Sequence, residues 1–70
     1  MTILETKNIL EKLATFEVKT RANKSYSYYN DVHRIHFSDT SFSVWYTNDQ
    51  CIPLFSVEYA DIKTIIITID

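Results

Sequence analysis

Glycine is absent from this 70-residue chain, and proline occurs once. Glycine adopts positive φ at turns most easily and lets a backbone approach a phosphate closely. Its absence excludes glycine-rich phosphate loops, dinucleotide-binding turns and nucleophile elbows, since each needs a position without a side chain. Turns must use asparagine and aspartate instead. The candidate turn residues, all flanked by strand-like residues, are Asn23, Asn30 with Asp31, Asp39, and Asn48 with Asp49.

Cysteine is nearly absent as well, with Cys51 the only one in the chain. An internal disulfide, a zinc cluster of thiolates and a CxxC redox pair are all excluded, and we expect a reducing environment. The start MTILETKN has neither the basic region nor the apolar core of a signal peptide. The longest apolar run, residues 65–67, is far too short to span a bilayer. These features predict a cytoplasmic protein that does not contact membranes.

Charge and size limit the function further. The net charge of −2 and the pI near 5.5 give no broad electrostatic footprint for a phosphate backbone. The hydrophobic fraction of 46% is too high for a disordered chain. We expect one domain over residues 1–70. A chain this short buries only about 60% of its unfolded surface, so association would add stability that a single core lacks.

The N-terminal segment has the pattern of a helix over residues 3–14. Thr2 followed by Glu5 fits a capping box, in which the hydroxyl accepts from a free backbone N–H and the glutamate reaches back to the cap. Apolar residues then recur at helical spacing. This stripe consists of Ile3, Thr6, Ile9, Leu10 and Leu13.

From Phe16 onward the pattern alternates with period two and is rich in β-branched and aromatic residues. Strands are predicted at residues 16–20, 26–29, 32–37, 42–47, 52–59 and 63–69, the second and third of which could form one bent strand. The turns SDTS and TNDQ favour antiparallel hairpins. The fold class is therefore α+β: an N-terminal helix followed by a four- to six-stranded antiparallel sheet, either open or curled into a small SH3- or Sm-like barrel.

Several predicted strands are apolar on both faces, although one helix can cover only one face of a sheet. Ile65 and Ile67 alternate with Ile66, and Phe42 and Val44 alternate with Trp45. The second face must be shielded either by closure of a barrel or by another molecule.

The residues that could carry chemistry do not form a recognisable site. His33 and His36 are three apart on a predicted strand, so their side chains point to opposite faces and cannot bind one metal. Glu58 and Asp61 flank a bend and are interpreted as solvent-exposed turn residues. We expect no enzyme activity, no metal, no cofactor and no small-molecule substrate.

Aromatic residues are the strongest functional signal. Tyrosine and tryptophan anchor protein interfaces, and they also stack on the bases of single-stranded nucleic acid. The first hypothesis is a non-enzymatic protein-binding module, such as a small inhibitor or accessory factor of the type that phages and mobile elements encode, or a subunit of a homo-oligomer. It is expected to act through a single aromatic sheet face, with partner-binding residues among Tyr26, Tyr28, Tyr29, Trp45 and Tyr46. The alternative is a single-stranded nucleic-acid-binding small barrel that uses the basic and aromatic stretch from Lys19 to Arg34, with Lys19, Arg21, Lys24 and Arg34 as the phosphate contacts.

The order of elements also resembles that of the bacterial Sm-like RNA chaperones. The resemblance is carried by the N-terminal helix, the FSDTSFSV segment and the C-terminal VEYADIKTIIITID segment. It implies a small barrel of one helix and five strands. Where that family has a Tyr-Lys-His-Ala run that contacts RNA, this chain has Glu58, Tyr59, Ala60 and Asp61, so no RNA-contacting residues carry over.

Overall fold

The computed structural model describes residues 2–48 and 51–67. It contains one N-terminal helix and two three-stranded antiparallel sheets. The elements, in chain order, are α1 (Ile3–Glu11), β1 (Thr15–Thr20), β2 (Ser25–Tyr29), β3 (His33–Phe37), β4 (Ser41–Tyr46), β5 (Phe55–Glu58), a 3₁₀ turn η1 (Tyr59–Asp61) and β6 (Ile62–Ile67).

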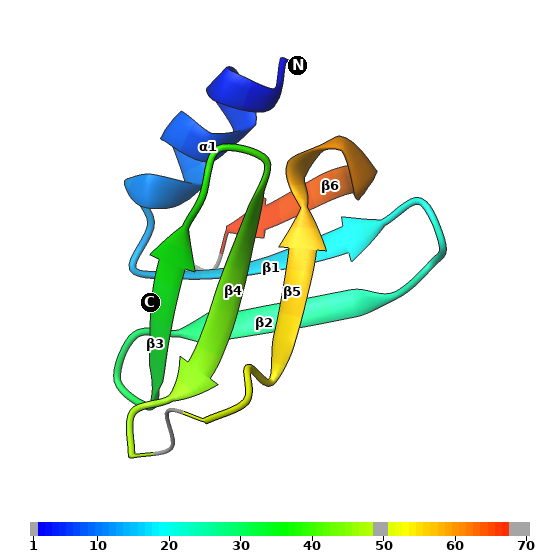
Figure 1. The fold of residues 1–70 in the computed structure, drawn as a ribbon. Helices are drawn as coiled ribbons and strands as arrows, with labels where there is room; N and C mark the ends of the chain where they lie inside the picture. Colours follow the sequence, from blue (N-terminus) through cyan, green and yellow to red (C-terminus); the bar gives the residue numbers. More distant parts are fainter. Residues whose placement is uncertain (1, 49–50, 68–70) are drawn as a thin grey trace.

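The two sheets pack face to face, and their strands run across one another (Figure 1). One sheet has the order β2-β1-β6 and the other has the order β3-β4-β5. The α+β class is confirmed, whereas the expectation of a single sheet is corrected. Within the described ranges the sheets do not close into a barrel, because no ladder joins β2 to β5 or β6 to β3.

The core lies between the sheets and is largely aromatic. Phe42 on β4 is fully buried, and its ring meets Phe16 on β1 edge-on at a centroid distance of 5.6 Å. Phe16 in turn packs against Tyr28 at 5.3 Å. Val18 and Val44 are also fully buried, one from each sheet. Each sheet therefore covers the inner face of the other, whereas the outer faces keep Trp45 half-buried and Ile66 37% exposed.

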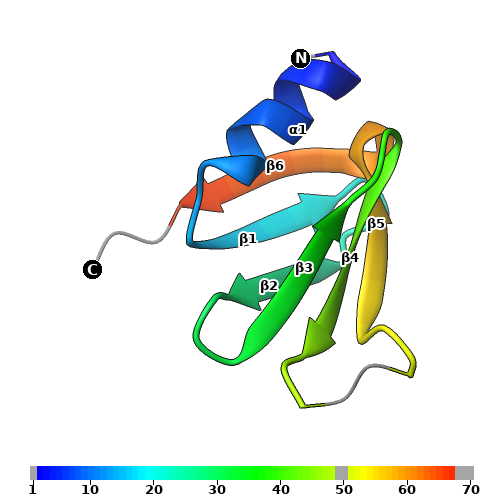
Figure 2. The same ribbon diagram turned by 60° about the vertical axis from the view of Figure 1, so that its left-hand side comes forward.

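Helix α1 covers the end of the core beside β6 and the turn between β3 and β4 (Figures 1 and 2). Thr2 caps it, since its hydroxyl accepts a hydrogen bond from the Glu5 N–H at 3.1 Å. The glutamate carboxylate accepts from that hydroxyl rather than from the backbone, so only half of the predicted capping box forms. The buried face consists of Thr6 and Leu10, whereas Ile3 and Ile9 are exposed.

The helix ends three residues earlier than predicted, at Glu11, and the chain then enters β1. No helix in the described part of the chain has the length and apolar character needed to cross a bilayer.

One turn uses an asparagine with positive φ in place of glycine, as the sequence predicts. Asn23, between β1 and β2, has φ of 62° and is the one described residue with positive φ. Ser38 donates its N–H to the Ser41 carbonyl, so the SDTS hairpin forms as predicted. Residues 49 and 50 of the predicted TNDQ turn and residues 68–69 of the last predicted strand lie outside the described residues. Strand β5 begins at Phe55, two residues after Pro53, and not at Ile52.

Tyr59 connects η1 to the core. Its side chain is buried, its hydroxyl donates to the Ser38 carbonyl at 2.9 Å, and its ring stacks on Phe42. Burial, reinforced by the Glu11 and Asp39 carboxylates, raises the pKa of Tyr59 to about 12. Burial also raises the pKa of Tyr28.

We predict that Phe42→Ala lowers the free energy of unfolding by about 3–5 kcal/mol, because it leaves a cavity where four aromatic rings meet the Phe42 ring. Urea denaturation followed by circular dichroism measures the loss. Ile52→Ala, at a side chain that is 76% exposed, is the control and should change little. A loss below about 1 kcal/mol for Phe42→Ala would contradict this packing.

Alkaline pH should destabilise the fold through Tyr59. The folded pKa of about 12 lies above the ordinary 10.0, so the unfolded chain releases this proton more readily. The stabilising contribution is complete below pH 10 and is lost as the pH rises towards 12. Its size is on the order of 2 kcal/mol. In Tyr59→Phe the unfolding free energy should fall less steeply over this range, and parallel pH curves for the two proteins would rule the effect out.

Candidate functional site: a tyrosine patch and a groove between two edge strands

The five aromatic residues singled out in the sequence do not lie on one face. Tyr28 is buried between the sheets, and Tyr26 packs against Phe55 with a centroid distance of 4.9 Å. Trp45 is half-buried on the outer face of the β3-β4-β5 sheet. Tyr29 and Tyr46 are exposed at the ends of their strands. The expectation of a single aromatic sheet face is therefore corrected, because alternation places neighbouring tyrosines on opposite sides.

Tyr29, Val32 and Tyr46 form an exposed cluster, which we call the tyrosine patch. Their exposed fractions are 47%, 45% and 49%. The His33 ring lies between the two tyrosine rings, at centroid distances of 5.9 Å and 5.3 Å. The turn before β3 meets the end of β4 here, since the Thr47 N–H donates to the Val32 carbonyl.

His33 holds this patch in place. Its Nδ1 accepts a hydrogen bond from the Tyr29 backbone N–H at 3.1 Å, which satisfies an amide at the free edge of β2. His36 lies on the other face of β3, opposite Ser43. The two histidines are thus on opposite faces, as the sequence predicts. No group of three metal-ligating side chains occurs among the described residues.

The outer face of the β3-β4-β5 sheet is mostly polar. Its exception is Trp45, whose ring lies 5.5 Å from the Arg34 guanidinium carbon. These two side chains, with Ile35 and His36, line a shallow hollow of about 320 Å³. On the same face, the Ser43 and Ser56 hydroxyls form a hydrogen bond at 2.7 Å.

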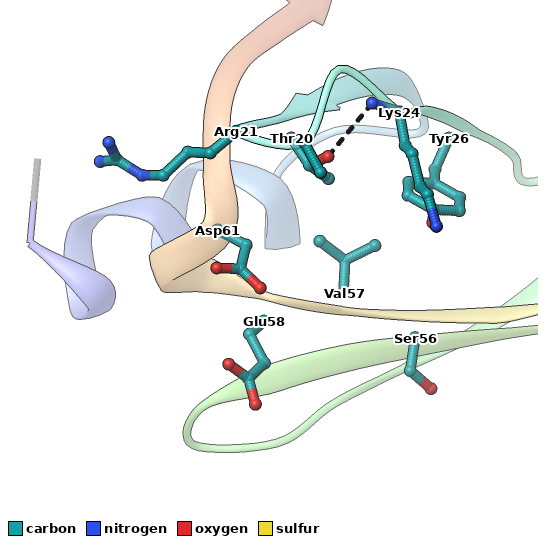
Figure 3. A pocket seen from close by; sticks show the side chains of 9 residues that line it. Thr20, Arg21, Lys24, Tyr26, Ser56, Val57, Glu58 and Asp61 are labelled. Carbon is teal, nitrogen blue, oxygen red and sulfur yellow. Dashed lines mark hydrogen bonds between the residues drawn. The ribbon is translucent and has the colours of Figure 1, made fainter.

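A larger groove of about 510 Å³ lies between edge strands β2 and β5, and we call it the seam groove (Figure 3). One wall is the β1–β2 hairpin, and the other wall is β5 with η1. The hairpin residues that line it include Arg21, Lys24 and Tyr26. The opposite wall includes Val57, Glu58 and Asp61.

Local contacts fix the walls of the seam groove. The Arg21 N–H donates to the Asp61 carbonyl at 2.9 Å, and its Nε donates to the Ala60 carbonyl at 3.2 Å. These bonds connect the hairpin to η1. The guanidinium group points away from the groove, whereas the Lys24 side chain lies beside Tyr26 (Figure 3). The Lys24 N–H donates to the Thr20 hydroxyl.

The four basic residues of the alternative hypothesis lie on different surfaces. Arg21 and Lys24 flank the seam groove, which they share with Glu58 and Asp61. Lys19 points outward from β1, away from the buried Val18 and Thr20. Arg34 lies on the outer face of the second sheet. They do not form one track for a phosphate backbone.

The sequence does not reveal the seam groove. The sequence pattern indicates only turn residues at Glu58 and Asp61, and nothing in the alternation of β5 shows that its edge faces the β1–β2 hairpin. The pair of acidic residues Glu58 and Asp61 is the only feature of the sequence that could have indicated the seam groove.

Comparisons of this chain with protein-family models, with curated proteins and with solved structures found no match.

We predict that His33→Phe, which retains a ring but removes the acceptor, accelerates hydrogen exchange of the Tyr29 amide roughly fivefold to tenfold, as expected for a hydrogen bond of about 1 kcal/mol. Amide exchange followed by NMR measures this. The Tyr28 amide faces β1 and serves as the internal control, because its rate should stay unchanged. Equal Tyr29 rates in both proteins would show that the imidazole does not hold this amide.

Proposed function

We propose that the protein is a non-enzymatic protein-binding module whose contact surface is the tyrosine patch. The observation that carries this proposal is the exposure of Tyr29, Val32 and Tyr46 at one end of the two sheets, with both tyrosine rings in contact with the His33 ring. Contiguous exposed apolar groups are typical of interaction sites.

The composition and rigidity of the patch suit a protein partner. Tyrosine supplies a large contact area with few rotatable bonds, and its hydroxyl tolerates a partly wet interface. The His33 contacts restrict both tyrosines before binding, which lowers the entropy cost of association. Such a surface fits a small inhibitor or accessory factor, or the interface between copies of this chain.

The nucleic-acid alternative has less support. Arg21, Lys24 and Tyr26 do share the seam groove, but two carboxylates lie on the opposite wall and would repel phosphate. The salt dependence of binding separates the hypotheses, because nucleic-acid affinity falls steeply with salt. Oligonucleotide binding of that kind would overturn the proposal.

The test compares the wild type with the double variant Tyr29→Ser/Tyr46→Ser. Light scattering over a concentration series measures self-association, and affinity capture from the host followed by mass spectrometry identifies a different protein partner. We expect the double variant to lose the association while its melting temperature stays within a few degrees of the wild type.

Leu4→Ser is the matched control, because Leu4 is a 65% exposed apolar residue on α1. It should retain the association. A wild type that stays monomeric, together with the same captured proteins for the wild type and the double variant, would contradict the proposal.

A further inference from the structure

We infer that the seam groove binds an extended segment of a partner protein, which adds as an antiparallel strand to the free edge of β5 and carries alternating apolar and basic side chains. This goes beyond the proposed function, because the seam groove is a second surface, separate from the tyrosine patch.

The backbone of β5 is oriented for strand addition. The Tyr59 N–H donates to the Thr40 carbonyl across the β4–β5 pair. Because hydrogen-bonded positions alternate along an antiparallel pair, the N–H and C=O groups of Val57 face β4. Those of Ser56 and Glu58 point the other way, to the free edge of the sheet. Added strands bind proteins through such backbone groups.

The edge of β5 is only four residues long and ends on Glu58, but it lacks the strongest features that block strand addition. Edge strands are commonly protected by lysine, by proline within the strand or by a covering loop. Strand β5 reads FSVE and contains neither lysine nor proline. The edge of β2 differs, because the Tyr29 N–H already donates to His33.

The seam groove has room for a strand and a preformed shape. Its volume of about 510 Å³ lies within the range of ligand sites in proteins. The Arg21 hydrogen bonds to η1 hold the two walls together, so little rearrangement is needed on binding. Tyr26 and Val57 provide an apolar surface for the side chains that point inward.

The charges of the seam groove favour a basic partner. Glu58 and Asp61 lie on the wall formed by β5 and η1, and Lys7–Glu11 is the one ion pair among residues 2–48 and 51–67. Arg21 could balance these acids, but its guanidinium points away from the groove (Figure 3). The Glu58 carboxylate lies across β5 from Val57 and the hairpin, on the outward face of the sheet (Figure 3), where no cation of the lining accompanies it.

The orientations of Glu58 and Val57 on β5 determine the register of the added strand. A partner residue directly opposite Glu58 shares its outward-facing side, where an opposite charge stabilises a cross-strand pair. A partner residue opposite Val57 points inward and is apolar. The recognised segment therefore alternates valine-like and lysine-like residues, with the amide of each basic residue hydrogen-bonded to β5.

The probe is a fluorescein-labelled peptide of alternating valine and lysine, titrated with the full chain and followed by anisotropy. N-methylation of the lysine amides should abolish binding, since these amides face β5, whereas N-methylation of the valine amides should leave it. A peptide of alternating valine and glutamate should not bind. Failure of the lysine peptide to bind, or equal binding of both methylated forms, overturns the inference.

Variants of the protein locate the site. Ser56→Pro removes a donor that faces the groove without breaking the β4–β5 ladder, and it should abolish binding. Ser27→Pro on the other edge strand, β2, is the matched control and should bind like the wild type. Glu58→Lys should weaken binding roughly tenfold and keeps the test valid even if Ser56→Pro does not fold.

Tyr29→Ser/Tyr46→Ser should bind the peptide with unchanged affinity. This outcome keeps the seam groove distinct from the tyrosine patch, so either proposal can fail alone. Equal affinities for Glu58→Lys and the wild type would overturn the inference.

Discussion

The packing of two small sheets against each other is the constraint on which the rest of the structure depends. Phe42 meets Phe16 across the interface, and both are essentially inaccessible to solvent. A chain of this size can form only one hydrophobic core, and one helix could not cover a six-stranded sheet. Splitting the strands into two sheets lets each shield the other. Helix α1 is then needed only at one end, where Leu10 completes the core.

The same arrangement creates the surfaces that we propose for function. No ladder joins the two sheets between β2 and β5, so the edges of these strands face each other across the seam groove without pairing. At the other end of β2 the chain turns into β3 and leaves Tyr29 and Val32 exposed beside Tyr46. Core contacts and local hydrogen bonds hold the residues next to both surfaces. We propose that binding uses the tyrosine patch and the seam groove, which the small core leaves exposed, and that it requires no catalytic group.

Local features of the fold could be predicted from the sequence, whereas contacts between faces could not. Thr2 marks the helix start, Asn23 supplies the positive φ, and the period of two places His33 and His36 on opposite faces. Alternation shows which side chains share a face but not what that face contacts. Tyr28 and Tyr29 therefore looked equivalent, although one belongs to the core and the other to the surface. The seam groove brings together two walls whose nearest lining residues, Tyr26 and Ser56, are 30 residues apart in the sequence, and no local sequence pattern predicts such a long-range contact.

Amide hydrogen exchange of the unbound protein measures whether the seam between β2 and β5 is open. We expect slow exchange for the amides of Val57 and Phe42, which pair within the β3-β4-β5 sheet, and fast exchange for Ser56 and Glu58, which face the groove. Slow exchange at Ser56 and Glu58 would contradict an open seam, because those amides would then have partners and the sheets would be joined along this edge.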